Sequence, residues 1–459
     1  MDRVSLTAEY LSKLEKSNPK SSELLGALPE NKILNSDKPG GKGKWLARPM
    51  FLGGAELAQL TDDLDNLLTA LSSLPDRLFD GDFAAFARAV GLNDEQVSAV
   101  LLGRGASMTR QSRADMICDS SGFKLLELNM GSTIGGAENV DVCRELLAHP
   151  ALAEFAERHG LGFVDSLREQ VNNVLAESGF SADDRPVVAL TEQPGCFEDE
   201  VRYMTALCER WREFGLLAEP CHLGQLKVRD DRVWLGGKPV DIVVRTFLIR
   251  DMESPEVRAL AEAVFAAANR GEVAIFTAMD TSAYASKGAL AMLSDERNRD
   301  LFSAAELASM DRILPWTRMV RPGTVTLESG ERVDLLEYAA AHQRELVLKP
   351  TSLSGGRGVV LGWADDVTPQ RWREQLTAAL DSPFVLQRRV RAELEQLPDG
   401  DGELRPFRPV WGVFTGANGF AGASVRAIPE TVGDVVVNVS NGAHVGAVLH
   451  QKAEPAPAR

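Results

Sequence analysis

Leucine residues recur at steps of three and four along residues 57–74, and Pro75 follows them directly. This spacing lines the leucines along one face of a helix, so it predicts an amphipathic helix that packs on a core and stops at the proline. Two further helices are predicted, one over Phe83–Val90 and one after Asn93, which stands three residues before a glutamine as in a capping box. We therefore expect residues 1–100 to form an N-terminal helical segment.

Amphipathic and wholly apolar segments alternate along residues 146–280. This alternation predicts a parallel sheet with helices on its faces, a Rossmann-like α/β arrangement whose ligands bind beyond the carboxyl ends of the strands. Arg245 lies near the end of one such strand and is a candidate to hold an anion, although an arginine satisfied within the structure explains it equally well. The expected elements are the helices Val164–Glu177, Glu198–Phe214 and 255–269, the strands Pro186–Leu190, Val240–Leu248 and Ala274–Phe276, and a hairpin of Leu226–Val228 with Val233–Leu235.

The predicted secondary structure changes from mainly helix to mainly strand near residue 346. Residues 281–345 are predicted to be mainly helical, including Lys287–Leu293, and residues 346–450 are predicted to be rich in strands. The acidic stretch Ala392–Glu403 is predicted to be a mobile loop and the tail Gln451–Arg459 to be disordered. The fold class is therefore a mixture of α/β and α+β. The expected strands are Leu346–Lys349, Val359–Trp363, Phe384–Val390, Val410–Thr415, Gly422–Ala427 and Val435–Val439.

A β-hairpin is predicted over residues 113–129, with two arms joined by the polar turn Asp-Ser-Ser-Gly. Side chains alternate between the faces of a strand, so Arg113 and Asp115 share one face of the first arm. Glu127 and Asn129 likewise share one face of the second arm. Pairing of the arms can bring three oxygen-bearing side chains and one guanidinium together. Mg²⁺ binds through a few carboxylates while it keeps waters and phosphates, so the hairpin is a candidate magnesium site.

A glycine-rich loop follows a predicted strand that ends in Lys349. Glycine lets backbone N–H groups approach phosphate oxygens, and a lysine at the end of the strand can neutralise phosphate charge. The loop is neither a Walker A motif nor a Rossmann fingerprint. Gln387, near the end of a later strand, belongs to an edge of the kind that binds an adenine ring. The loop residues proposed to contact phosphate are Ser354, Gly355, Gly356, Arg357 and Gly358.

Other polar side chains are candidates to hold a substrate. The Gly- and Ser-rich stretch Met130–Asn139 leaves the hairpin beside the proposed metal site, so Ser132 or Thr133 can hold a carboxylate or a phosphate. A plain strand-to-helix turn is an equally good interpretation of that stretch. Arg426 and Asn438, on late strands, are candidates for the lining of the same pocket, and purely structural roles suit them as well.

The hairpin and the loop together resemble the ATP-grasp superfamily, in which a nucleotide lies between two α+β subdomains. The metal-binding Glu-x-Asn precedes the loop here, an order that resembles the circularly permuted ATP-grasp group, which includes glutathionylspermidine synthase. Members of this group carry an Arg-x-Asp shortly before the Glu-x-Asn, and this chain has Arg113-Ala114-Asp115 and Glu127-Leu128-Asn129. The resemblance covers residues 100–450.

The resemblance implies ATP and Mg²⁺ as cofactors and assigns roles to matching residues. Asp115, Glu127 and Asn129 match the Mg²⁺ ligands of the family. Arg113 matches the arginine that stabilises charge in the transition state, and Lys349 matches a phosphate-binding lysine.

A second phosphate-binding lysine is not obvious, so Arg318 or Lys287 is expected to substitute for it. The stretch that begins at Met130 departs from the acidic, Thr-Pro-containing sequence of glutathionylspermidine synthase, which leaves the substrate open.

The implied activity is that of an ATP-dependent carboxylate–amine ligase, which forms an amide through an acyl phosphate and releases ADP and phosphate. The acid and the amine are expected to be an amino acid, a peptide or a polyamine. Two other functions stay open, namely a phosphotransferase acting on a small molecule and an inactive nucleotide-binding scaffold.

Composition and residue spacing limit the expected partners, metal sites and location of the protein. The net charge of −16 disfavours nucleic acid and anionic membranes as partners. The five cysteines include no CxxC pair, and the histidines lack zinc-site spacing. No signal peptide or membrane span is evident, so a cytoplasmic location is expected, and a homodimer is compatible with the sequence. The expected domains are the helical segment 1–100, the metal-binding hairpin of an ATP-grasp core 101–145, an α/β substrate domain 146–280, an ATP-binding lid and core 281–450 and a tail 451–459.

Overall fold

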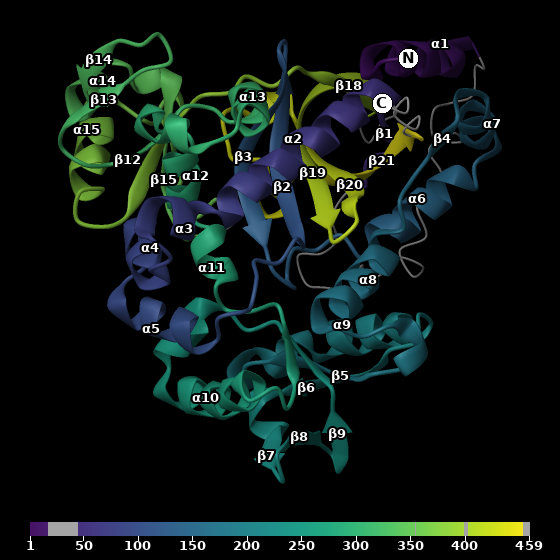
Figure 1. Cartoon of the computed structure of the whole chain (residues 1–459). Helices are drawn as coiled ribbons and strands as arrows, with labels where there is room; N and C mark the ends of the chain where they lie inside the picture. The colour runs from purple at the N-terminus through teal and green to yellow at the C-terminus, as the bar shows by residue number, and fades with distance from the viewer. Residues whose placement is uncertain (17–44, 354, 399–402, 453–459) are drawn as a thin grey trace.

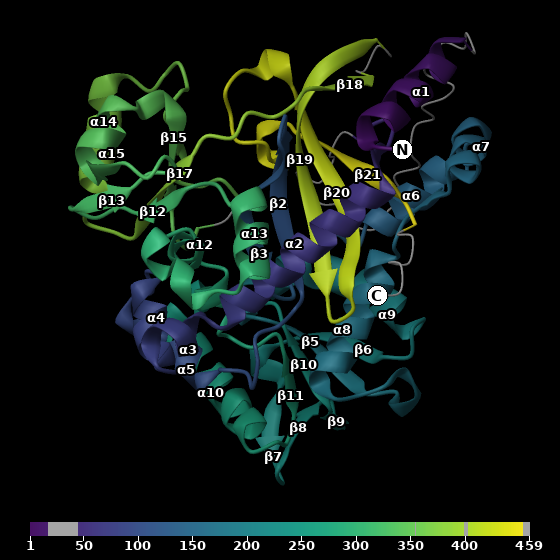
Figure 2. The same cartoon turned by 45° about the horizontal axis from the view of Figure 1, so that its top comes forward.

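The computed structural model describes residues 1–16, 45–353, 355–398 and 403–452 of the chain. Within these ranges the fold is a mixed α/β arrangement organised around a central sheet, a parallel sheet and a smaller antiparallel sheet (Figure 1). The parallel sheet and the small antiparallel sheet lie on different sides of the central sheet (Figures 1 and 2). Residues 453–459 of the predicted disordered tail lie outside the described residues.

The central sheet has eight strands and pairs the first and last strands of the described residues, β1 and β21. Its main order is β1-β21-β20-β19-β2-β3, with β18 paired to β19 and β4 paired to β21. All neighbours are antiparallel except β1 and β21, which are parallel. The strands are β1 (Met50–Leu52), β2 (Ser112–Asp119), β3 (Gly122–Met130), β4 (Leu161–Gly162), β18 (Glu395–Pro398), β19 (Leu404–Gly416), β20 (Gly419–Pro429) and β21 (His444–Gln451).

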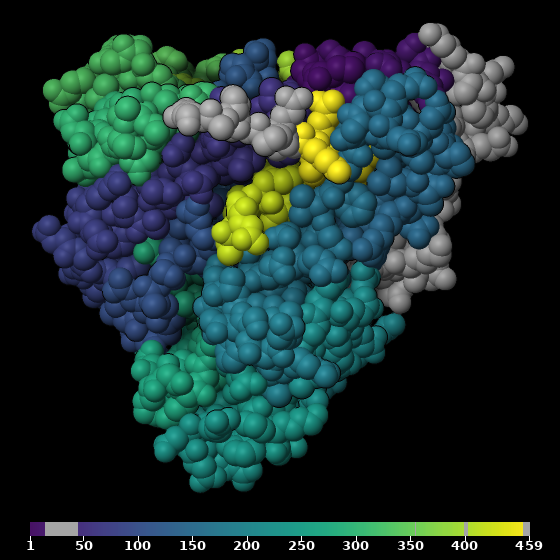
Figure 3. All heavy atoms as spheres, turned by 45° about the vertical axis from the view of Figure 1, so that its right-hand side comes forward, coloured from purple at the N-terminus to yellow at the C-terminus, as the bar shows by residue number. Residues whose placement is uncertain are grey.

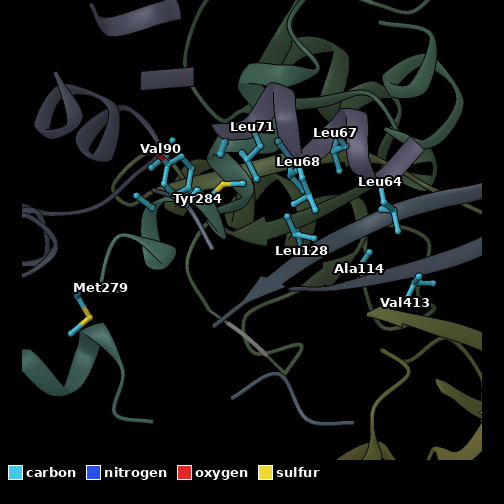
Figure 4. Packing of buried hydrophobic residues seen from close by; sticks show 14 of the residues in the cluster. Leu64, Leu67, Leu68, Leu71, Val90, Ala114, Leu128, Met279, Tyr284 and Val413 are labelled. Atoms are coloured by element: carbon cyan, nitrogen blue, oxygen red, sulfur yellow. The ribbon is translucent and has the colours of Figure 1, made fainter. Parts of the chain in front are cut away.

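The leucine stripe forms helix α2 (Gly54–Ser72), which crosses the central sheet. Its apolar face packs against β2, β3 and β19, and each buried leucine contributes about 1.5–3 kcal/mol by leaving water. Pro75 occupies the first turn of α3 (Leu74–Phe79), so the predicted stop is the start of a new helix. In Figure 4 the side chains Leu64, Leu67, Leu68 and Leu71 face Ala114, Leu128 and Val413.

The other N-terminal helices also follow the sequence pattern. Helix α4 is Phe83–Ala89, and α5 is Asp94–Leu102 with Asn93 and Gln96 forming the expected capping box. The short strand β1 was not predicted, because three apolar residues show no periodicity of their own.

The parallel sheet follows the order β11-β10-β5-β6, as the alternating pattern predicts. The predicted single strand Val240–Leu248 is wrong, because the chain breaks at Asp241, whose carboxylate accepts a hydrogen bond from the backbone N–H of Val187 (2.8 Å). Residues before the break belong to a separate three-stranded sheet. The strands and helices here are β5 (Val187–Glu192), β6 (Leu217–His222), β7 (Lys227–Arg229), β8 (Arg232–Leu235), β9 (Lys238–Val240), β10 (Ile242–Arg245), β11 (Ala274–Phe276), α8 (Ser166–Ser178), α9 (Pro194–Arg212) and α10 (Pro255–Asn269).

The small antiparallel sheet has the order β12-β17-β15-β16 and packs against helices α14 and α15 over its own hydrophobic core. The predicted helix Lys287–Leu293 is confirmed as α12. The three short strands between residues 317 and 334 were not predicted. The elements are α11 (Thr281–Tyr284), α12, α13 (Ala304–Ile313), β12 (Thr317–Met319), β13 (Thr324–Thr326), β14 (Arg332–Asp334), α14 (Leu335–Ala341), β15 (Leu346–Pro350), β16 (Val360–Leu361), α15 (Pro369–Ala378) and β17 (Phe384–Arg388).

Two predictions near the C-terminus are wrong. The valine run Val435–Val439 is not a strand, because it is a loop in which the Asn438 side chain accepts a hydrogen bond from the backbone of Asn441 (2.8 Å). The strand that does follow, β21, begins at His444 and reaches Gln451, a residue expected to be disordered. Pairing with both β1 and β20 orders β21, and neither pairing is visible in the local sequence.

The N-terminal helix α1 (Arg3–Lys16) packs beside α6 (Asn139–Leu147) and α7 (Pro150–His159) through a cluster that includes Tyr10, Phe51 and Phe155. Figure 3 shows α1 in purple next to α7 in blue on one face of the molecule.

Two arginines extend this anchoring to the acidic stretch after β17. Arg3 donates to Glu393 (2.7 Å) and to Glu395 (3.0 Å), and the fully buried Arg48 also donates to Glu395 (3.0 Å). The described part of the predicted mobile loop is therefore held, with β18 inside it. No helix in the described ranges combines the length and apolarity that crossing a bilayer requires.

Candidate functional site

A cleft of about 1100 Å³ lies where the central sheet, the small antiparallel sheet and the carboxyl end of the parallel sheet meet. It receives side chains from the hairpin, from both sheets beside it and from the loop after β20. Most of the sequence candidates lie in its wall, namely Arg113, Asp115, Glu127, Asn129, Ser132, Thr133, Arg245, Lys349, Gly355, Gly356, Gln387, Arg426 and Asn438.

The hairpin β2–β3 brings its four candidate side chains together as expected. Arg113 lies opposite Asn129, and Asp115 lies opposite Glu127. The Arg113 guanidinium donates to Asp115 (Nε to Oδ1, 2.7 Å), and the Asn129 amide donates to the other oxygen of Asp115 (3.3 Å). The register shifts next to the Asp115 pair, so Leu126 is an extra residue in β3.

Asp115 is the most strongly held acid of the cleft. It is 4% exposed and also forms an ion pair with Arg426 (Nη2 to Oδ2, 2.7 Å). Burial alone would raise the pKa of Asp115, but Arg113 and Arg426 outweigh burial and lower this pKa to about 2. The carboxylate therefore stays ionised at neutral pH.

Lys349 enters the cleft from strand β15. Its Nζ donates to the Gln387 side chain (2.7 Å) and to the backbone carbonyl of Leu126 (3.1 Å), the extra residue of the hairpin. Burial lowers the pKa of Lys349 to about 8, while the charge of Glu127 acts in the opposite direction. Gln387 therefore holds the lysine, and its own amide donates to Thr317 (3.2 Å).

Lys287, at the first turn of α12, is the second lysine of the cleft. Its Nζ lies 3.0 Å from Oε2 of Glu127 and donates to the carbonyl of Leu353 in the glycine-rich stretch (3.0 Å). Lys287 thus joins the hairpin to that stretch.

Arg318, the alternative candidate, does not line the cleft. Along β12, Thr317 faces Gln387 and the next residue points to the opposite side, where Arg318 donates to the Ser294 carbonyl (2.8 Å) and pairs with Glu296. The assignment of Arg318 to the nucleotide site is corrected, because strand alternation turns its side chain away.

The glycine-rich stretch covers one side of the cleft. Gly356 has a φ of +74°, and a Cβ there would lie 2.8 Å from the Val436 side chain, so a larger residue cannot fit without displacement. The Asn438 side chain donates to the carbonyl of Gly355 (3.0 Å), which joins this stretch to the loop after β20. Arg357 and Gly358 are not part of the cleft wall, and Ser354 lies outside the described residues.

The far end of the cleft contains Ser132, Thr133 and Arg245. The Ser132 hydroxyl donates to the backbone carbonyl of Arg245. The Arg245 guanidinium is engaged by the carbonyls of Thr277 (2.9 Å), Ala278 (3.2 Å) and Phe247 and by the Thr281 hydroxyl (3.2 Å). Burial lowers the pKa of Arg245 to about 10. Of the two interpretations left open for Arg245, these contacts support the structural one, since neutral groups already satisfy the guanidinium.

The oxygen donors of the hairpin fit a magnesium ion that completes its shell elsewhere. The set contains two carboxylates and one amide, and the described residues include no group of three acidic, histidine or cysteine side chains suited to a metal. Mg²⁺ typically takes one or two carboxylates together with waters and substrate phosphates. The donor set therefore suits a metal that arrives with a phosphorylated ligand.

Sequence comparison finds no relative for this chain, since no protein-family model matches it and no curated protein sequence is significantly similar. Comparison with solved structures does find a similar fold. A glutathione synthetase-like effector from Globodera pallida, in its apo form, superposes with a TM-score of 0.55 at 12% identity, over 98% of this chain and 97% of that one.

Two more distant similarities do not contribute to the fold assignment. A putative gamma-glutamylcysteine synthetase from Methylobacillus flagellatus KT has a TM-score of 0.38 at 11% identity, over 85% of each chain. D-cycloserine synthetase DcsG has a TM-score of 0.29 at 20% identity, over 57% of this chain and 75% of that one.

The chain therefore has a fold of the glutathione synthetase-like kind over nearly its whole length, as the resemblance to permuted ATP-grasp ligases predicted.

Proposed function

We propose that this chain is an ATP-dependent carboxylate–amine ligase. The observation that carries the proposal is the meeting, in one cleft, of Asp115, Glu127 and Asn129 with Lys349 and the glycine-rich stretch. Oxygen donors for a divalent cation and groups that bind phosphate are needed side by side when a phosphoryl group is transferred. The glutathione synthetase-like fold agrees with this chemistry.

The reaction would begin with transfer of the γ-phosphoryl group of ATP to a substrate carboxylate, which gives an acyl phosphate and ADP. An amine would then attack the carbonyl carbon, so that a C–N bond forms, the C–O bond to phosphate breaks and the amine loses a proton. Because the protein supplies little covalent chemistry in such transfers, positioning and charge stabilisation carry the catalysis.

Each group of the cleft has a defined task in this proposal. Asp115, Glu127 and Asn129 would hold Mg²⁺, which supplies positive charge at the phosphate oxygens. Arg113 would stabilise the charge that develops on the transferred phosphoryl group.

The nucleotide would be held by lysine side chains and backbone groups. Lys349, Gly355 and Gly356 would hold its phosphates, with Lys287 as the second lysine in place of Arg318. Gln387 would act mainly by holding Lys349, to which it is hydrogen-bonded (2.7 Å).

The substrates are proposed to be a small carboxylic acid and a small amine, drawn from amino acids, peptides and polyamines. Thr133 and Arg426 are the side chains proposed to meet the acid, because both line the cleft beside Arg113. Arg426 already pairs with a carboxylate, that of Asp115 (2.7 Å).

A phosphate-release screen with Mg-ATP tests this proposal. Pairs of amino acids, peptides and polyamines are offered to the full chain, and phosphate is expected only when an acid and an amine are both present. Asp115→Ala, Glu127→Ala and Lys349→Ala should each lower turnover by about 10³-fold or more while the melting temperature shows a folded protein. The control is Asp62→Ala, which removes an exposed acid of α2. It should release phosphate with every acid–amine pair that the unmodified protein uses.

Three outcomes would contradict the proposal. Wild-type turnover in any two of the three variants rules out the site assignment. A stable phosphorylated product in the absence of an amine identifies a phosphotransferase instead. Absence of any Mg-ATP binding rules out an ATP-dependent ligase.

A further inference from the structure

The ion pair between Lys287 and Glu127 occupies a carboxylate that the proposed function assigns to Mg²⁺. The Lys287 side chain is almost completely buried and lies 3.0 Å from Glu127, with a further hydrogen bond to the Leu353 carbonyl (3.0 Å). The backbone N–H of Lys287 also donates to the carbonyl of Thr351 (3.0 Å). The lysine is therefore fixed in position at both its backbone and its charged end.

Asp115, the other acid of the metal site, is likewise paired. Arg113 donates to one of its oxygens (2.7 Å), and Arg426 lies 2.7 Å from the other. Both hairpin carboxylates thus have cationic partners before any ligand is present.

The charges around the metal site are unequal. The cations Arg113, Arg426, Lys287 and Lys349 surround two carboxylates, Asp115 and Glu127. Glu138 is a third acid, close enough to Arg113 for their charges to interact, so four cations face three acids. A lone divalent cation entering this group would meet more positive than negative charge, in a partly buried site where water screens charges weakly. A nucleoside triphosphate carries several negative charges, and the same four cations attract it. Triphosphate and metal together therefore suit the site, whereas the metal alone does not.

We infer that Lys287 locks Glu127 until nucleotide phosphates take over the lysine, so that the divalent cation binds with the nucleotide and not before it. This inference rests on the proposed metal and nucleotide assignments. It gives Lys287 a positioning role beyond contact with phosphate, because the lysine sets the order in which ligands bind. Release of Lys287 from Glu127 would at the same moment free the carboxylate for the metal.

Manganese binding without nucleotide tests the inference, because Mn²⁺ takes the same oxygen ligands as Mg²⁺ and its free form is measured directly by electron paramagnetic resonance. The full chain is titrated as wild type and as Lys287→Met, Lys287→Arg and Lys238→Met. Lys238→Met is the matched control. It removes the exposed lysine at the start of β9, which forms an ion pair with Glu219 of β6. Lys287→Met should bind Mn²⁺ at least about tenfold more tightly than the wild type, because Glu127 loses its positive partner. Lys287→Arg and the control should behave like the wild type.

Equal Mn²⁺ affinity in wild type and Lys287→Met would overturn the inference, whether that affinity is high or low. If Lys287→Met does not melt as a folded protein, the wild type is titrated with and without a non-hydrolysable ATP analogue. Binding of Mn²⁺ to the protein–analogue complex that is at least about tenfold tighter than to the protein alone and to the analogue alone supports the inference, and binding no tighter than to the analogue alone overturns it. Neither titration depends on turnover, so a failed ligase assay and a failed locking mechanism are distinguishable.

Discussion

Two arginines line different parts of the same cleft and differ in burial and in their main partners. Arg113, at the hairpin end, is partly exposed and donates to the ionised carboxylate of Asp115, which it shares with Arg426, and to the backbone carbonyl of Ile134. Arg245, at the end of the parallel sheet, is surrounded by backbone carbonyls and a hydroxyl and is 4% exposed. Both were candidates for binding an anion, and only the partners distinguish them.

The difference between the partners of Arg113 and Arg245 shows which kind of partner lets an arginine bind a ligand. The Asp115 carboxylate can stay paired with Arg426 while Arg113 binds an incoming anion. The charge of Arg113 can therefore interact with a ligand. Carbonyls fixed in the backbone cannot move away, and the Arg245 guanidinium has its donors directed at them. We therefore expect changes at Arg113 to affect rate and changes at Arg245 to affect stability.

The largest effect is expected at the hairpin end. Arg113→Lys keeps the charge but loses the fork that reaches the phosphoryl group, so kcat should fall by about 10²–10³-fold. Nucleotide affinity should stay near that of the wild type, because the interaction forms mainly in the transition state. Steady-state phosphate release and calorimetric binding separate the two quantities. A loss of affinity at unchanged kcat would place Arg113 in ground-state binding instead.

The next effect is expected at the other end. Arg245→Met leaves the carbonyls of Thr277 and Ala278 buried without their donor, so the free energy of unfolding should fall by about 3 kcal/mol. The Arg245→Met molecules that are folded should have the same kcat as the wild type. Urea unfolding followed by circular dichroism measures the change, with Arg250→Met on the same wall as a control that should shift stability by less than about 0.5 kcal/mol. Equal stability of the two variants would show that the carbonyls do not need the guanidinium.

A pH dependence should come from Lys349, which lies against the hairpin at Leu126. The pKa of Lys349 is lowered to about 8 by burial, so the empty site loses this positive charge as pH rises through 8. Affinity for an ATP analogue should therefore be greatest below pH 8 and fall by up to about tenfold per pH unit above it. Lys349→Arg stays charged throughout and should flatten the profile between pH 7 and 9.5 in calorimetric titrations. An identical fall in this variant would assign the dependence to another group.

The smallest effect is expected at the contact between the loop after the hairpin and Arg245. Ser132 donates its hydroxyl to the carbonyl of Arg245, so Ser132→Ala removes one hydrogen bond between the hairpin loop and the parallel sheet. The free energy of unfolding should fall by about 1 kcal/mol. Thr133→Ala, at the exposed neighbour, should leave stability unchanged and act only on the KM of the acid substrate. A change of stability in Thr133→Ala that matches that of Ser132→Ala would mean that the loop acts as one unit.

Local patterns accounted for much of the fold and for part of the site. The leucine stripe of α2, the capping box at Asn93 and the hairpin over residues 113–129 depend on neighbours in the chain, and each was predicted. The alternation that places Asp115 and Glu127 on one face needs only the period of a strand. The resemblance to permuted ATP-grasp ligases followed from the order of two motifs, which is also a property of the sequence alone, and the structural similarity agrees with it.

The remainder depends on contacts between distant segments. The choice between Lys287 and Arg318 is made by the direction in which β12 presents its side chains, and a three-residue strand gives no periodicity to read. The extra residue Leu126 exists only in the pairing of β3 with β2. The acidic stretch after β17 looked mobile because its partners, Arg3 and Arg48, lie at the other end of the sequence.

The order of strands in the central sheet has a consequence for how the protein is made. Strand β2 pairs with β3 immediately, but its other edge waits for β19, which leaves the ribosome only after the whole parallel and small antiparallel sheets. At about 5–20 residues per second this delay lasts on the order of tens of seconds. During that time the nascent chain carries an open strand edge, which can pair with other chains. Slow or interrupted translation before residue 404 is therefore expected to leave an aggregation-prone intermediate that bears nearly the whole candidate metal site.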